Sequence, residues 1–134
     1  MRNRRSSMQK SPARLLPSLS VRIDLDREGR IGPGKIELLE NIRKFGSISA
    51  AGRAMDMSYK RAWDLVDEIN RICRQAAVER QTGGKNGGGA ALTPFGISLV
   101  ARYRKIEREA ASAVRKELLG LQSDIGKPKK TASR

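Results

Sequence analysis

The chain has 134 residues, enough for one domain but not for two of ordinary size. It carries 28 Lys and Arg residues against 14 Asp and Glu residues, a formal net charge of +14 at neutral pH. Such an excess implies an anionic partner: nucleic acid, a membrane surface or an acidic protein. No apolar run reaches the about eighteen residues of a membrane span, and none after Arg14 is long enough for a secretory signal.

The residue types exclude most catalytic chemistry. The chain has no histidine and one cysteine, Cys73, so it cannot form an internal disulfide, a Ser-His-Asp triad or a zinc site built on soft ligands. We therefore expect a cytoplasmic protein that is not an enzyme, with no catalytic residue, no metal and no cofactor. Its 1 Trp, 2 Tyr and 2 Phe are too few for a single-strand binder built on stacked bases.

The ends of the chain differ in composition from the middle. Residues 1–20 contain basic side chains and no acidic one, and residues 122–134 contain four basic side chains and Asp124. Neither segment has apolar periodicity, so we expect two basic flexible tails around a domain over residues 21–121. The tails either serve solubility alone or bind phosphates without reading sequence.

The central region begins with a strand and a helix. Residues 21–26 alternate apolar and polar side chains, which predicts a short strand followed by a turn at Gly29 and Gly32. Pro33 opens a helix that Gly46 ends. One apolar stripe runs along this helix: Ile36, Leu38, Leu39, Ile42 and Phe45.

Two more helices follow in close succession. Ser47 or Ser49 can cap a short helix over residues 48–55, and Ser58 can cap a longer helix that runs to about Gln75.

The sequence of these two helices is typical of a helix-turn-helix. Two helices that cross steeply over a short turn need small side chains where they touch, and Ala51, Gly52 and Ala62 provide them. The alternative is an ordinary helical hairpin with a polar outer face.

The period then changes from that of helices to that of strands. Residues 76–81 and 90–92 fit two strands of a hairpin, joined by a glycine-rich loop over residues 82–89. Thr93 caps a last helix with Pro94 at its first position. The element order predicts an α+β, mainly α, fold: a winged helix-turn-helix domain followed by a long C-terminal helix.

The last helix has a stripe that could either cover its own domain or pair with a second copy. The preceding elements already have core stripes, so we favour a symmetric homodimer through residues 97–119. The expected dimerisation residues are Leu99, Tyr103, Ile106, Ala110 and Ala113.

Polar side chains at the start of the longer helix could enter a major groove, where Lys60 or Arg61 can donate to guanine. The side chains expected to read or flank bases are Ser58, Tyr59, Lys60, Arg61 and Asp64. Those expected to hold the DNA backbone are Arg53, Arg80 and Lys85.

Several neighbouring residues have more than one interpretation. Trp63 is either a core residue, which we favour, or a base contact. The glycine loop is either a wing that approaches the DNA or a connector that touches nothing. A phosphate-binding loop of nucleotide-binding proteins is disfavoured, because that motif has Ser or Thr after its lysine and Asn86 stands there. Asp64, Asp67 and Glu68 favour solvated ion pairs over a metal or acid-base site.

The sequence also resembles a known family, the ModE-type molybdate-responsive transcription regulators, over residues 21–119. The resemblance is to their N-terminal DNA-binding domain, which is related to that of the LysR-type regulators. Its most specific parts are Gly-Ser-Ile-Ser-Ala-Ala at 46–51, Ser-Tyr-Lys-Arg-Ala-Trp-Asp at 58–64, Val-Glu-Arg-Gln-Thr-Gly-Gly-Lys-Asn-Gly-Gly-Gly-Ala at 78–90 and Leu-Thr-Pro-Phe-Gly at 92–96.

The resemblance implies DNA binding and supports a dimer. Molybdate-sensing members carry a further C-terminal oxyanion-binding region, so the chain resembles the short, stand-alone members. The regulated genes would concern molybdate uptake or molybdoenzymes.

We therefore expect a dimeric, sequence-specific regulator of transcription that binds double-stranded DNA. The alternative is a nucleoid-type DNA-binding protein with little sequence preference, dominated by the tails and the net charge. A further alternative is a protein-binding module that serves a separate oxyanion-sensing partner.

Overall fold

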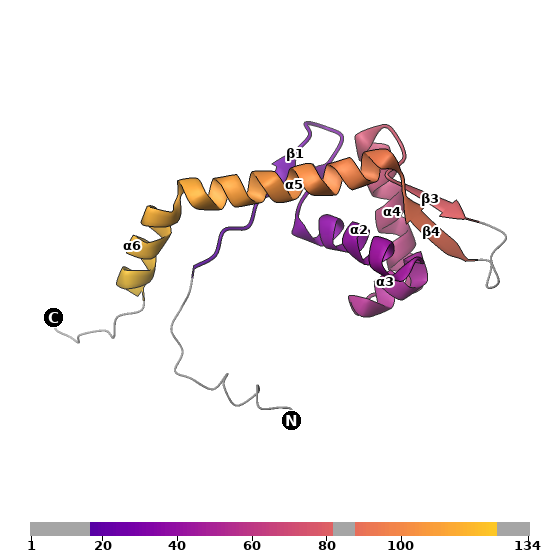
Figure 1. The fold of residues 1–134 in the computed structure, drawn as a ribbon, viewed down its shortest axis with the longest axis horizontal. Helices are drawn as coiled ribbons and strands as arrows, with labels where there is room; N and C mark the ends of the chain where they lie inside the picture. The colour runs from indigo at the N-terminus through magenta and orange to yellow at the C-terminus, as the bar shows by residue number, and fades with distance from the viewer. Residues whose placement is uncertain (1–16, 82–87, 126–134) are drawn as a thin grey trace, which may run out of the picture. The chain divides into compact units, whose positions relative to one another are not determined.

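A computed structural model describes residues 17–81 and 88–125. Most of the two predicted tails, the tip of the predicted hairpin and Lys85 lie outside these ranges. The fold is α+β and mainly helical: the described residues form five helices and two small antiparallel sheets (Figure 1). The chain divides into two compact units, one over Ser20–Glu109 and one that contains the residues up to Leu19 and from Ala110 onward.

The first unit begins with a hairpin instead of one strand. Strand β1 (Ile23–Asp24) pairs with β2 (Arg30–Ile31), with Ile23 opposite Ile31. Gly29 closes the turn with a φ of 137°, and its carbonyl accepts a 2.7 Å hydrogen bond from the Leu25 N–H. The prediction of one strand over residues 21–26 was therefore incomplete, because β2 is too short to show an alternating pattern.

Helix α2 (Pro33–Phe45) supplies the centre of the core and ends where predicted. Gly46 adopts a left-handed conformation, with a φ of 76°, and its N–H donates to the Ile42 carbonyl over 2.8 Å. The prediction that Phe45 belongs to the buried stripe was wrong, because Phe45 is 46% exposed and lies beneath the ammonium of Lys44. The remaining four stripe residues are fully buried: Ile36, Leu38, Leu39 and Ile42.

Helices α3 (Ile48–Ala54) and α4 (Tyr59–Cys73) follow with the predicted caps. The Ser47 hydroxyl accepts from the Ala50 N–H at 2.9 Å, and the Ser58 hydroxyl accepts from the Arg61 N–H at 3.0 Å. In Figure 1, α2, α3 and α4 cluster together.

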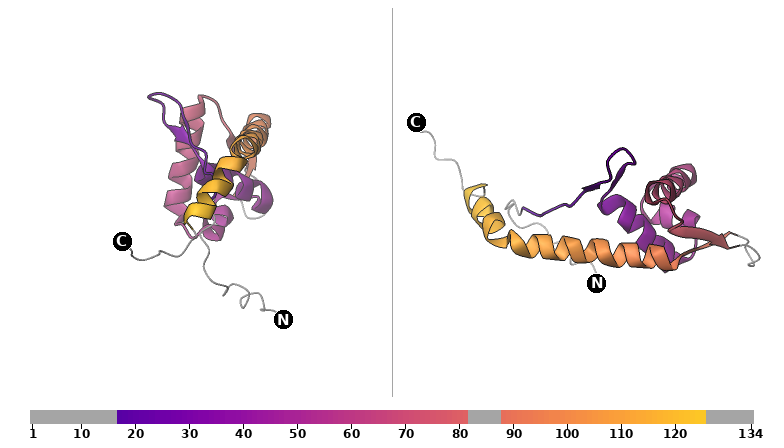
Figure 2. Two further views of the ribbon diagram at one scale, coloured as in Figure 1. Left: turned by 90° about the vertical axis from the view of Figure 1, so that its left-hand side faces the viewer. Right: turned by 90° about the horizontal axis from the view of Figure 1, so that it is seen from above.

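Strands β3 (Val78–Gln81) and β4 (Gly89–Leu92) form the predicted second hairpin, which projects away from the helices (Figure 2). Asn70 of α4 fixes its start, because the Asn70 side-chain carbonyl accepts from the Ala77 N–H at 2.8 Å. The Ala90 N–H donates to the Gly46 carbonyl at 2.9 Å, which ties β4 to the end of α2. The hairpin is thus anchored to two helices.

Helix α5 (Pro94–Ala113) starts against the segment that precedes β3, at Ala76 and Ala77, and reaches the core. The Thr93 hydroxyl caps it by accepting from the Gly96 N–H, and donates to the Ala76 carbonyl. Tyr103 is only 1% exposed, and its hydroxyl donates to the Val21 carbonyl at 2.6 Å. Within the described residues the buried core contains no polar or charged residue other than this tyrosine.

The second unit contains the end of α5, a turn at Val114, helix α6 (Arg115–Ile125) and residues 17–19. The sequence predicts one long helix that begins at Pro94 and contains the dimerisation region 97–119, but the structure divides this region between α5, which ends at Ala113, and α6. No residue of α6 is fully buried, and Leu119 is 53% exposed.

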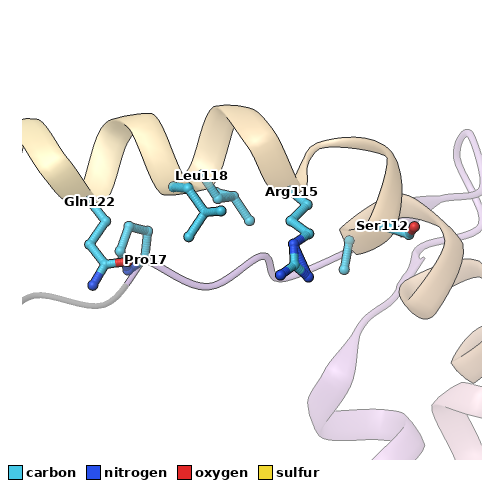
Figure 3. Close-up of a pocket in the computed structure, with 7 residues that line it drawn as sticks. Pro17, Ser112, Arg115, Leu118 and Gln122 are labelled. Carbon is cyan, nitrogen blue, oxygen red and sulfur yellow. The ribbon is translucent and has the colours of Figure 1, made fainter.

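A cavity of about 440 Å³ lies in this unit. In Figure 3, Leu118 and Gln122 of α6 point toward the segment that carries Pro17. None of the helices within residues 17–81 and 88–125 is long and apolar enough to cross a membrane.

Candidate nucleic-acid interface

The angle between α3 and α4 depends on the contact of two small residues. A Cβ added to Gly52 would lie 2.9 Å from the Cβ of Ala62, closer than such atoms approach in proteins. Ala62 itself is fully buried, and the Met57 N–H donates to the Gly52 carbonyl at 2.9 Å across the turn. The two helices therefore meet in the way that the sequence predicts, at residues where a larger side chain would force them apart.

Helix α4 has one buried face and one polar face. Five side chains face the core: Ala62, Leu65, Val66, Ile69 and Ile72. Lys60, Asp64, Asp67 and Arg71 follow one another at helical spacing on the exposed face. The Lys60 ammonium lies 2.9 Å from the Asp64 carboxylate, with side-chain exposures of 82% and 53%. An ion pair this exposed contributes little stability, so both side chains can exchange this contact for another partner.

On one side of this exposed face, an aromatic pair supports an arginine of the hairpin. The Arg80 guanidinium of β3 lies 4.6 Å from the ring centroid of Trp63, and the Tyr59 ring meets Trp63 edge to face at 6.1 Å. Tyr59 is 59% exposed, whereas Trp63 is partly buried against the core. A cavity of about 120 Å³, lined also by Ser49 and Gln81, lies between these groups.

Trp63 is therefore both a core residue and a platform for Arg80. The sequence does not indicate the second role. Trp63 and Arg80 are seventeen positions apart on different elements, so no local pattern encodes their contact. The stacking restricts the arginine to the side of the hairpin that faces α4, and a guanidinium stacked on indole is stabilised by the cation–π interaction.

The remaining predicted DNA-binding residues lie at the surface. Arg53 of α3 is exposed and donates to the Ser49 hydroxyl at 2.9 Å. Arg61 is exposed in the first turn of α4, and Ser58 is occupied as its cap. Lys85 lies outside the described residues.

Other reactive groups are scarce. No group of three His, Cys, Asp or Glu side chains that could hold a metal occurs in the part of the chain that the structure describes. Burial raises the pKa of the Cys73 thiol, so this cysteine stays protonated at neutral pH and acts as a small apolar residue.

The residues predicted for dimerisation do not share one environment. Leu99 packs against the core of the first unit, and Tyr103 is inside it, so Tyr103 is unavailable to a second copy. Ile106 is 39% exposed, Ala110 is half-buried and Ala113 is exposed. The predicted stripe therefore covers its own domain in its first half and is accessible in its second.

No protein-family model matches the chain. It is similar to several curated bacterial proteins. It is 40% identical to the molybdenum transport protein ModE of Azotobacter vinelandii, over 69% of this chain and 34% of the relative. It is 47% identical to the molybdenum-pterin-binding protein MopB of Rhodobacter capsulatus, over 65% of this chain and 33% of the relative. It is 46% identical to the DNA-binding transcriptional dual regulator ModE of Escherichia coli K12, over 53% of this chain and 27% of the relative.

These similarities relate the chain to the ModE and Mop proteins, in agreement with the resemblance found in its motifs. The relatives are named as regulators or as molybdenum-binding or transport proteins, not as enzymes. The chain spans about a third of the length of the curated relatives that it matches.

Proposed function

We propose that this chain is a sequence-specific, double-stranded DNA-binding regulator of transcription with a winged helix-turn-helix domain. The observation that carries the proposal is the start of α4. Lys60 and Arg61 are exposed in its first turn, and the β3–β4 hairpin holds Arg80 on Trp63 of the same helix. In this proposal α4 is the helix that enters the major groove, and the hairpin is the wing.

The side chains of α4 have the chemistry for this role. Lysine and arginine donate to guanine O6 and N7, and Asp64 can accept from the amino group of cytosine. Asp64 is paired with Lys60 in the DNA-free protein, and this exposed contact can be exchanged for base contacts in the groove. Arg53 and Arg80, on either neighbouring element, would contact phosphates and fix the position of α4 in the groove.

We further propose that the protein acts as a homodimer through the accessible part of the predicted stripe, which includes Ile106 and Ala113. A two-fold dimer would place two copies of α4 on half-sites one or more turns of DNA apart. By similarity to the relatives named ModE, the regulated genes would concern molybdate uptake or molybdoenzymes, and a separate oxyanion-sensing protein is a candidate second partner.

The test is a comparison of two variants that lose the same charge. Genomic-site enrichment would first provide the operator. Lys60→Ala/Arg61→Ala should then remove the preference for the operator over unrelated DNA, a ratio of roughly 10³ or more for a specific regulator. The control is Arg102→Ala/Arg108→Ala, which removes two exposed cations of α5. If the Lys60→Ala/Arg61→Ala variant kept the same preference for the operator as the control, the assignment of α4 as the reading helix would be refuted.

A nucleoid-type binder with little sequence preference is the second candidate, favoured by the net charge of +14. For such a protein, unrelated DNA would compete as well as any enriched site. Deletion of residues 1–20 and 122–134 would then flatten the salt dependence of binding most.

A further inference from the structure

Another cavity, larger than the one beside Trp63, lies on the other side of α4. It has a volume of about 600 Å³, and its walls come from the β1–β2 hairpin, the start of α2 and the turn between α3 and α4. Arg61 and Leu65 line it, whereas Tyr59 and Trp63 line the smaller cavity beside the wing. Two residues along an α-helix correspond to a rotation of about 200°, so the two cavities lie on opposite sides of α4.

Basic side chains dominate this larger cavity. Its charged residues are all cationic: Arg22, Arg30, Lys35 and Arg61. Arg22 pairs with Asp24 at 2.9 Å and Lys35 pairs with Glu68 at 3.2 Å, but neither carboxylate lines the cavity.

The other two cations, Arg30 and Arg61, have no carboxylate partner within residues 17–81 and 88–125. Every one of the 14 acidic residues lies in those ranges. Two of the four cations that line the cavity are thus not neutralised by a carboxylate of the described residues.

The apolar part of the wall strengthens the attraction for an anion. Met55, Met57 and Leu65 line the same cavity, and charges that are partly shielded from water by apolar groups interact more strongly than charges in bulk solvent. Arginine is the side chain best suited to phosphate, because its planar guanidinium can donate two parallel hydrogen bonds.

We propose that this cavity binds a phosphate group of the DNA backbone beside the groove that α4 enters. The inference rests on the proposed function and adds a contact surface to it: the β1–β2 hairpin. Arg80 is on one side of α4 and the cluster of Arg22, Arg30 and Arg61 is on the other. A helix in a major groove has one phosphate backbone on each side, so this arrangement supplies cations to both strands.

Arg30→Gln tests the proposal, with Arg27→Gln as the matched control. Arg27 is exposed in the turn of the same hairpin and does not line the cavity. The measurement is the affinity for duplex DNA as a function of salt concentration. The logarithm of the association constant falls linearly with the logarithm of salt concentration. Losing one phosphate contact should make this negative slope shallower by about 0.9, which corresponds to about fivefold weaker binding at 0.15 M salt. Arg30→Lys keeps the charge and should keep the slope, and Arg27→Gln should behave like the wild type.

The outcomes separate this proposal from the function on which it rests. If the wild type does not bind duplex DNA, the proposed function fails and this assignment fails with it. If the wild type binds and Arg30→Gln has the same slope as Arg27→Gln, only the cavity assignment is overturned. NMR titration of the DNA-free protein with inorganic phosphate provides a further arm. Saturable binding that needs Arg30, together with an unchanged DNA slope, would assign the cavity to a free anion and overturn the backbone contact.

Discussion

Among the glycines that the structure describes, Gly96 leaves the least room for a side chain. It is buried in the first turn of α5, where a Cβ would lie 2.1 Å from the Ala77 carbonyl oxygen. Since real Cβ contacts are essentially never shorter than 3.0 Å, the helix and the backbone at Ala77 would have to separate by at least 0.9 Å. The Thr93 N–H donates to the same oxygen at 3.0 Å, so the separation would also stretch this hydrogen bond.

We expect Gly96→Ala to lower the free energy of unfolding by about 3 kcal/mol, the upper part of the range for overpacking, although alanine is the better helix former. Gly120→Ala is the control. It makes the same change inside α6, where a Cβ would have no neighbour within 4 Å, and should be neutral or slightly stabilising. The assay is urea unfolding followed by circular dichroism. A Gly96→Ala protein as stable as the wild type would show that the close approach of α5 to the backbone at Ala77 is not required.

Three further substitutions test single contacts of the first unit. Glu40→Gln should cost about 0.5–1 kcal/mol, because Glu40 accepts two hydrogen bonds from Arg104 at 2.9 and 2.8 Å. The hydrogen bond from Arg104 lowers the pKa of Glu40 below its ordinary value of 4.5, so the cost should be complete above that pH and disappear as the pH falls below it in acid unfolding curves. Asn70→Ala should cost about 1–3 kcal/mol in urea unfolding, since it leaves the Ala77 N–H without an acceptor, and a loss below 0.5 kcal/mol would contradict this. Trp63→Leu should weaken binding to duplex DNA about fivefold, or about 1 kcal/mol, while Trp63→Phe keeps most of the affinity. Equal affinities of the Leu and Phe variants would exclude the platform role.

The helices and the second hairpin were predictable because their signals are local. Ser47 and Ser58 are followed by apolar periodicity, Gly46 ends a stripe, and Thr93-Pro94 begins a helix, so each boundary is encoded within a few residues. The contact of Gly52 with Ala62 was predictable for a similar reason, since few residues allow two helices to cross so closely.

The features that escaped prediction depend on contacts between distant segments. Strand β2 has two residues and exists because it pairs with β1. The stripe of α5 shows that one face is apolar but not what covers it, and for Tyr103 the cover is its own core. The stacking of Arg80 on Trp63 and the gathering of cations around Arg61 arise only when separate elements meet.

The position of Tyr103 has a consequence for biosynthesis. It is the largest of the fully buried side chains, and its hydroxyl satisfies a carbonyl near the beginning of the domain. A nascent chain that has emerged only as far as the second hairpin lacks this side chain, so the hydrophobic core to which Tyr103 belongs is incomplete. We therefore expect folding on the ribosome to be completed only after the middle of α5 has emerged, and a recombinant fragment that stops after Leu92 to be less stable than the whole domain.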